Sequence, residues 1–126
     1  MRSVKQGAAR LGGLAAVAVL LSGCTATALD ASDVVGKTLA EVTAAVPHDA
    51  EFLIQDASPR IGEAASFSQD QPGKSWTVVA SCADAESIPD AKSVEVAVIP
   101  TKKFDADAAA SGKFDDAVSC DGRDYR

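Results

Sequence analysis

The chain has 126 residues, with 12 basic and 18 acidic side chains and a formal net charge of −6. This length suits one small domain rather than two. The excess of acid leaves no basic patch for a nucleic acid, and 9 glycines and 5 prolines are too few for a collagen or a linker array. Beyond the N-terminal region, no apolar run reaches the roughly 18 residues of a membrane-spanning helix.

The N-terminal region has the pattern of a secretory signal peptide. Three of the twelve basic residues lie within the first ten positions, and no acidic residue occurs before Asp30. The apolar run that follows, residues 11–21, suits a signal peptide and is too short to span a membrane. We therefore predict removal of residues 1–23, which leaves 103 residues with 9 basic and 18 acidic side chains and a net charge of −9.

The signal region ends in Leu21-Ser22-Gly23-Cys24. These residues resemble the lipobox of bacterial lipoproteins, in which a leucine lies three positions before the cysteine and two small residues lie between them. The resemblance implies cleavage before Cys24 and a diacylglyceryl thioether, carrying palmitate-like chains, on its sulfur. The domain would then be anchored at the extracytoplasmic face of the cell membrane, since two or more acyl chains bind stably to a lipid bilayer. The alternative is an ordinary secretory signal followed by an unmodified cysteine.

A short helix is predicted after a tether. Residues 24–32 comprise the anchoring cysteine and a small, polar tether. Thr38 and Glu41 have the spacing of a capping box, in which two side chains satisfy free N–H groups of the first helical turn. Apolar residues recur at helical spacing after Thr38, and Pro47 ends the helix after about nine residues.

Three strands are predicted after the helix. The first covers residues 51–55 and the second residues 75–82. The third, residues 93–99, alternates most regularly and is closed by Pro100. Turn residues separate the first two strands, and an acidic loop of residues 83–90 separates the last two.

The second strand contains the only tryptophan, Trp76. Trp76 could bind a ligand by stacking on a sugar, since an aromatic face suits the CH groups of a carbohydrate. Trp76, Val78 and Ala80 also alternate with Thr77, Val79 and Ser81, which places the first three on one face and indicates that Trp76 belongs to the core.

The C-terminal region, residues 101–126, is an acidic tail in which residues 105–110 could form one or two helical turns. With Cys24 lipidated, Cys82 and Cys120 remain, and outside the cytoplasm they permit a single disulfide pairing. That bridge would enclose 37 residues and contribute about 4 kcal/mol. The alternative is two free thiols with a redox or metal role, but they have no CxxC spacing. The sequence leaves open whether the tail completes the fold or merely flanks it.

Residues 33–41 (DVVGKTLAE), with Gly36 at a tight turn before the helix, carry a family resemblance. Together with residues 76–79 (WTVV) and 88–94 (IPDAKSV), they resemble a PASTA domain over residues 33–100. The resemblance implies an α+β fold in which one short helix packs on a small three-stranded β-sheet. The disulfide-stapled tail lies outside that pattern, the segment between residues 55 and 75 is long for it, and residues 81–85 lack the usual Pro and Gly.

No catalytic site, metal site or cofactor is predicted from the remaining polar residues. His48 follows the proline that ends the helix, and an exposed histidine interacts favourably with the C-terminal end of a helix. The sequence contains no Gly-x-Ser-x-Gly motif that would supply a nucleophilic serine for it. The acidic pairs of the tail do not match a calcium-binding loop and are interpreted as a solvated surface; they are Asp105 with Asp107, and Asp115 with Asp116 and Asp121.

Two hypotheses for function follow, and neither is enzymatic. The PASTA resemblance implies a non-catalytic module that binds peptidoglycan or its muropeptide fragments near the membrane. The alternative is an accessory lipoprotein that contacts an envelope protein through its acidic surface, without a wall ligand. A net charge of −9 favours a basic protein partner and gives no long-range attraction to anionic wall polymers.

Overall fold

The computed structural model describes residues 28–120, 125 and 126. The predicted signal peptide and Cys24 lie outside these residues. Helix α3 spans Leu39–Ala45 and begins with the predicted capping box. The Thr38 side chain accepts a hydrogen bond from the Glu41 N–H at 3.2 Å, and the Glu41 carboxylate accepts one from the Thr38 N–H at 2.8 Å. Gly36 has φ +94°, a conformation that favours glycine, so the tight turn before the helix is confirmed.

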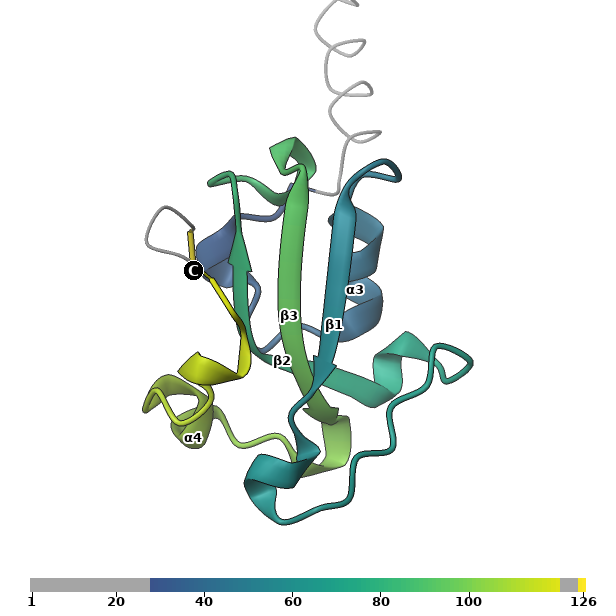
Figure 1. The fold of residues 1–126 in the computed structure, drawn as a ribbon, viewed down its shortest axis with the longest axis vertical. Helices are drawn as coiled ribbons and strands as arrows, with labels where there is room; N and C mark the ends of the chain where they lie inside the picture. Colours follow the sequence, from purple (N-terminus) through teal and green to yellow (C-terminus); the bar gives the residue numbers. More distant parts are fainter. Residues whose placement is uncertain (1–27, 121–124) are drawn as a thin grey trace, which may run out of the picture.

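The three predicted strands form one mixed sheet. They are β1, Glu51–Asp56; β2, Trp76–Ala83; and β3, Ser93–Pro100. The order is β1-β3-β2, with β3 parallel to β1 and antiparallel to β2. Helix α3 lies across one face of this sheet (Figure 1). The chain therefore has the predicted α+β fold, one short helix on a small three-stranded sheet.

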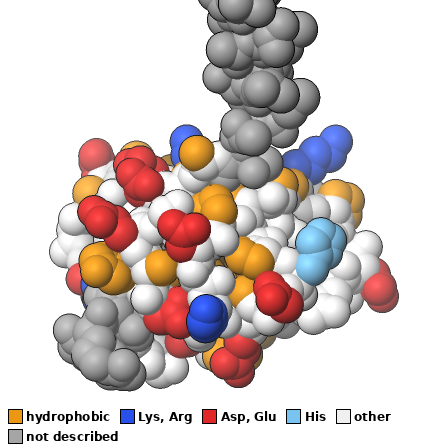
Figure 2. Space-filling model, turned by 90° about the horizontal axis from the view of Figure 1, so that it is seen from above, with side chains coloured by type: hydrophobic (Ala, Val, Ile, Leu, Met, Phe, Trp, Pro, Cys, Tyr) orange, Lys and Arg blue, Asp and Glu red, His pale blue; other side chains and the backbone are white. Residues whose placement is uncertain are grey.

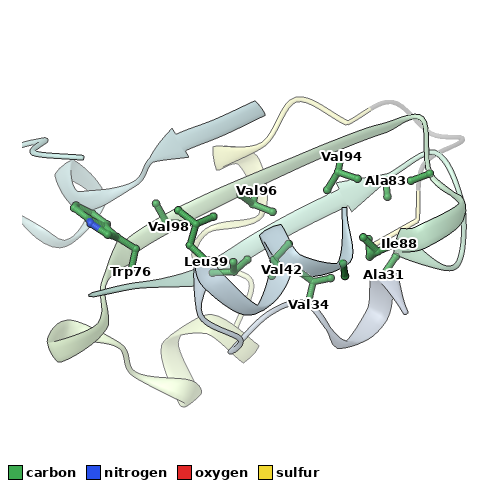
Figure 3. Packing of buried hydrophobic residues seen from close by; sticks show 13 residues of the cluster. Ala31, Val34, Leu39, Val42, Trp76, Ala83, Ile88, Val94, Val96 and Val98 are labelled. Atoms are coloured by element: carbon green, nitrogen blue, oxygen red, sulfur yellow. The ribbon is translucent and has the colours of Figure 1, made fainter. Parts of the chain in front are cut away.

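The face of the sheet beneath α3 forms the first of two hydrophobic layers, here called the helix-side core. Leu39 and Val42 of α3 pack over the central strand, whose inward residues Val94, Val96 and Val98 are at most 1% exposed. Figure 3 shows these side chains converging between the helix and the sheet. An amphipathic helix this short is marginal alone, so its stability derives from this packing.

The opposite face of the sheet carries a second layer, the tail-side core, because β2 contains a bulge. The pairing of β2 with β3 shifts register between Val78 and Ala80. As a result Val79 and Ala80 both belong to the tail-side core, and Trp76 and Val78 belong to the helix-side core. The prediction that Ala80 shares a face with Trp76 is wrong, since an extra residue in a bulge reverses the alternation beyond it.

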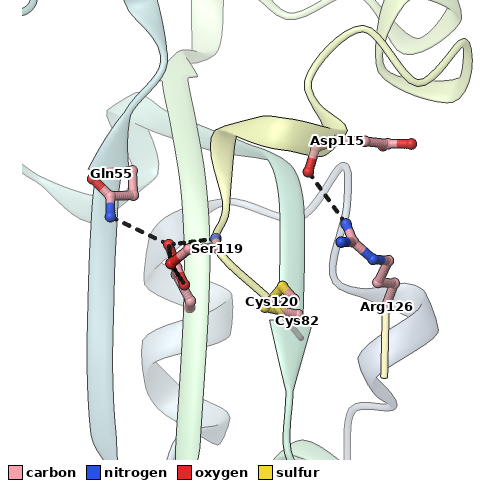
Figure 4. Close-up of a disulfide and its surroundings, with 7 residues drawn as sticks. Gln55, Cys82, Asp115, Ser119, Cys120 and Arg126 are labelled. Carbon is pink, nitrogen blue, oxygen red and sulfur yellow. Dashed lines mark hydrogen bonds between the residues drawn. A yellow bond between two sulfur atoms is a disulfide. The ribbon is translucent and has the colours of Figure 1, made fainter. Parts of the chain in front are cut away.

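The C-terminal tail covers this second face. After the short helix α4, Ala106–Ala110, the tail brings Phe114 and Val118 onto the sheet, with exposed fractions of 1% and 5%. The predicted disulfide between Cys82 and Cys120 is present, with the two Cα atoms 6.1 Å apart. The bulge is what turns Cys82 toward the tail (Figure 4).

A buried carboxylate next to the disulfide also holds the tail. Glu95 on β3 is 8% exposed. It accepts hydrogen bonds from the Ser119 hydroxyl at 3.0 Å, from the Ser119 N–H at 3.1 Å and from the Gln55 amide at 3.2 Å. Buried carboxylates need such donors, so Glu95 ties the residue before Cys120 to the middle of the sheet.

The last part of the predicted tether packs on the fold. Ala31 is 2% exposed and its N–H donates to the Glu86 carbonyl, and the Leu29 carbonyl accepts from Ile88. Both cores and the disulfide are built from residues between Leu29 and Cys120. A chain that begins at Thr25 therefore contains every packing contact of the fold and is expected to fold independently.

Candidate docking surface

Strand β1 forms an edge of the sheet that the described residues leave unpaired. Its only strand partner is β3. The N–H groups of Glu51 and Ala57 donate to the carbonyls of Lys92 and Val98, so the odd-numbered residues of β1 turn their backbone polar groups toward β3. Because successive residues of a strand turn their polar groups to opposite edges, the N–H and C=O of Phe52 and Ile54 point away from the sheet. Among the described residues, no backbone group accepts or donates to them.

The other edge of the sheet, along β2, is covered at both ends. Val78 exchanges backbone hydrogen bonds with the segment before α3, donating to Lys37 and accepting from Gly36, both at 2.9 Å. Tyr125 pairs with Ala83 through two backbone bonds of 2.8 and 2.9 Å. An uncovered edge is a site where another chain can add a strand, and here only β1 presents one within the described part of the chain.

A groove runs beside this open edge, on the helix side. It lies between helix α3 and the segment of residues 67–73, where the turn Gly73–Ser75 begins, and Ile54 is the residue of β1 that lines it. The space has a volume of about 460 Å³ and an apolar lining. We call it the α3–β1 groove; its lining residues are Leu39, Ala40, Thr43, Ala44, Ile54, Phe67, Gln69, Gln71 and Gly73.

The end of the α3–β1 groove is held in place by two contacts. The Asp56 carboxylate accepts from the N–H groups of Ser58, Ser66 and Phe67 at 2.7–2.9 Å. Partial burial raises the pKa of this carboxyl group, but these hydrogen bonds outweigh burial and hold its pKa below the ordinary value. On the helix side, an added Cβ at Gly73 would lie 2.8 Å from the Ala40 backbone nitrogen, so the close approach requires glycine.

The end of the domain where β1 begins is acidic. Strands β1 and β3 start at the end where β2 finishes, so the connections before β1 and between β2 and β3 lie together there (Figure 1). Figure 2 looks onto this end and shows many acidic and few basic side chains. These two connections and the start of β1 contribute one lysine, Lys92, and five acids, which are Asp49, Glu51, Asp84, Glu86 and Asp90.

Trp76 lies in the helix-side core, with 3% of its surface exposed. Phe67 packs edge-on against it, with ring centroids 5.2 Å apart, and its indole N–H donates to the Gln71 amide oxygen at 3.1 Å. Trp76 also lines a hollow of about 540 Å³, together with Lys102 and several residues that carry hydroxyl groups. The predicted ligand residue Trp76 is therefore buried, whereas stacking of a sugar requires an open ring face.

The other candidate residues do not come together into a site. His48 is exposed beyond the end of α3, as expected. The Asp105 carboxylate caps α4 by accepting from the Asp107 N–H at 3.0 Å, and Asp116 pairs with Arg60 at 2.6 Å. Asp121 lies outside the described residues. Within the described part of the chain, no three potential metal-ligating side chains cluster.

Strand β1 was predictable from its sequence, whereas the groove beside it was not. One signal was available, since acids at both ends of a short strand are typical of an edge strand.

Comparisons with known proteins found no relative: the chain matches no protein-family model, and no curated protein or solved structure is significantly similar to it. Residues 28–120, 125 and 126 also include no helix long and apolar enough to cross a membrane.

Proposed function

We propose that the chain is an extracytoplasmic lipoprotein, anchored through Cys24, whose domain is a non-catalytic binding module for another polypeptide of the cell envelope. The observation that carries the proposal is the apolar α3–β1 groove beside the unpaired edge of β1. A groove next to an open strand suits a peptide, because backbone groups supply affinity and the groove supplies specificity.

The covalent features of the chain support the location. The segment Leu21-Ser22-Gly23-Cys24 resembles a lipobox, and a disulfide persists in oxidising compartments outside the cytoplasm. Residues 25–28 separate Cys24 from Leu29, whose carbonyl accepts a hydrogen bond from Ile88. An anchored domain would therefore stay close to the membrane surface.

Replacement of the anchoring cysteine tests the location. We expect Cys24→Ser in the full chain to move the protein from the membrane fraction to the soluble extracytoplasmic fraction, because no acyl chains can then be attached. Fractionation and intact-mass measurement of the mature protein check this, with Cys120→Ser as the matched cysteine control that should stay in the membrane fraction. An unchanged distribution and an unmodified Cys24 would rule out the anchor.

A second candidate function is binding of peptidoglycan fragments, which the PASTA resemblance implies. One observation favours it, namely the hollow that Trp76 helps to line, where hydroxyl groups and the Lys102 amine could bind the sugar hydroxyls and carboxylates of a muropeptide. The buried position of the ring and the acid excess make this candidate the weaker of the two.

A titration with two probes separates the candidates. The oxidised chain from Thr25 to Arg126 is titrated with a blocked hexapeptide of alternating lysine and valine, and separately with purified muropeptides, while amide chemical shifts are recorded. We expect saturable shifts with the hexapeptide, weaker at 1 M salt, where the Debye length falls to about 3 Å. Saturable shifts around Trp76 with muropeptides, and none with the hexapeptide, would replace the first candidate by the second.

A further inference from the structure

We infer that β1 binds its partner by strand addition, and that the partner is an extended, basic segment of another protein with one apolar side chain in the α3–β1 groove. This inference rests on the proposed function and specifies its mode. It is carried by the unpaired polar groups of the edge, by the two faces of β1 and by the charge around them.

The backbone of β1 presents a row of free hydrogen-bonding groups. The outward N–H and C=O groups of Phe52 and Ile54 have no backbone partner among the described residues. Both residues are half-buried, so they are held in strand geometry by the sheet and the core. A segment that adds to them would gain backbone hydrogen bonds without reordering the domain, which keeps the entropic cost of binding low.

The two faces of β1 specify an alternating partner. Phe52 and Ile54 face the helix-side core, and Ile54 also lines the α3–β1 groove. Leu53 lies on the opposite face and is 45% exposed, one of three large apolar side chains exposed among the described residues. Side chains of an added strand alternate in the same way. The partner residue beside Ile54 would therefore enter the groove, and the partner residues on either side of it would lie on the face of Leu53 and Glu51.

The charge of the strand selects the partner. Glu51 stands at the start of β1 and Asp49 just before it, at the acidic end of the domain. Directly opposite residues of an antiparallel pair share a face, so two copies of β1 paired about Leu53 would place each Glu51 opposite the other copy's Gln55, and the strand EFLIQD offers it no lysine or arginine. A basic segment of another protein, with lysines or arginines beside Glu51, supplies the opposite charge that a second copy of β1 lacks.

A proline in β1 tests the mode directly. The Ile54 N–H points away from β3, so Ile54→Pro removes an outward donor and no bond of the ladder, a position where edge strands accept proline. Ile54→Ala is the matched control, because it truncates the same side chain and keeps the N–H. Both variants are made in the oxidised chain from Thr25 to Arg126 and titrated with the blocked lysine–valine hexapeptide, with melting temperatures compared first.

We expect the hexapeptide to shift the amides of residues 52–55 and of α3, and to bind Ile54→Pro at least about tenfold more weakly than Ile54→Ala. A hexapeptide methylated on alternate backbone nitrogens gives a second test that does not depend on the folding of a variant. On the unaltered chain it should lose binding to a similar degree.

Two results would overturn the inference. If the proline variant and the methylated peptide bind as well as their controls, or if the shifts lie away from β1 and α3, strand addition is wrong while a contact through the acidic surface survives. If the hexapeptide does not bind and muropeptides do, the proposed function itself falls, and strand addition falls with it.

Discussion

Loss of the Cys82–Cys120 disulfide is expected to lower the free energy of unfolding by about 4 kcal/mol. The bond closes a chain segment of 37 intervening residues, and a loop of that length gains much conformational freedom in the unfolded state when the bond is absent. Domains of this size have total stabilities of roughly 5–15 kcal/mol, so the loss would remove a large share.

The measurement is thermal unfolding of the oxidised chain from Thr25 to Arg126, compared with the Cys82→Ala/Cys120→Ala variant. At roughly 4–8 °C for each kcal/mol, the melting temperature should fall by on the order of 20 °C. A reducing agent should produce the same fall in the unaltered chain and none in the double variant. A fall of only a few degrees would show that packing of the tail, and not the covalent bond, holds it to the sheet.

The second large effect is expected at Phe114, the largest fully buried side chain of the tail. It is 1% exposed in the tail-side core, against residues that include Val79, Ala97 and Ile99. Truncation of a buried phenylalanine leaves a cavity and costs about 3–5 kcal/mol. We therefore expect Phe114→Ala to destabilise the domain about as much as loss of the disulfide.

Urea denaturation of the oxidised proteins measures this effect with the tail still covalently attached. Phe104→Ala is the matched control, because Phe104 is in the same tail but only partly buried, so its loss should cost clearly less. Equal and small losses at the two positions would mean that residues after Pro100 flank the sheet without stabilising it. The unequal result is expected because Phe114 covers a face of the sheet that would otherwise be open to water.

Local signals explain why the helix and strands were predictable. The capping box of Thr38 and Glu41, the proline after α3 and the alternation of β3 each act within a few residues of the chain. The disulfide was predictable for a different reason, since only two cysteines remain once Cys24 is assigned to the lipid.

The arrangement around the candidate site was not predictable in the same way. The bulge at Val79 has no signature in the strand itself, yet it turns Cys82 to the tail and separates Ala80 from Trp76. The α3–β1 groove depends on Gly73 approaching Ala40 and on Phe67 being held by Asp56, contacts between residues 11 to 33 positions apart. Such contacts depend on which surfaces pack together.

The sequence by itself therefore determined the elements, the single disulfide pairing, the acidic charge and the resemblance of the N-terminus to a lipoprotein signal. Only the tertiary structure decided that β3 is central, that the tail forms a second layer and that β1 keeps an open edge beside a groove. Caps, prolines and alternating side chains act through neighbouring backbone. Strand order and open edges result from burial of apolar surface between segments far apart in the chain, which no local pattern specifies.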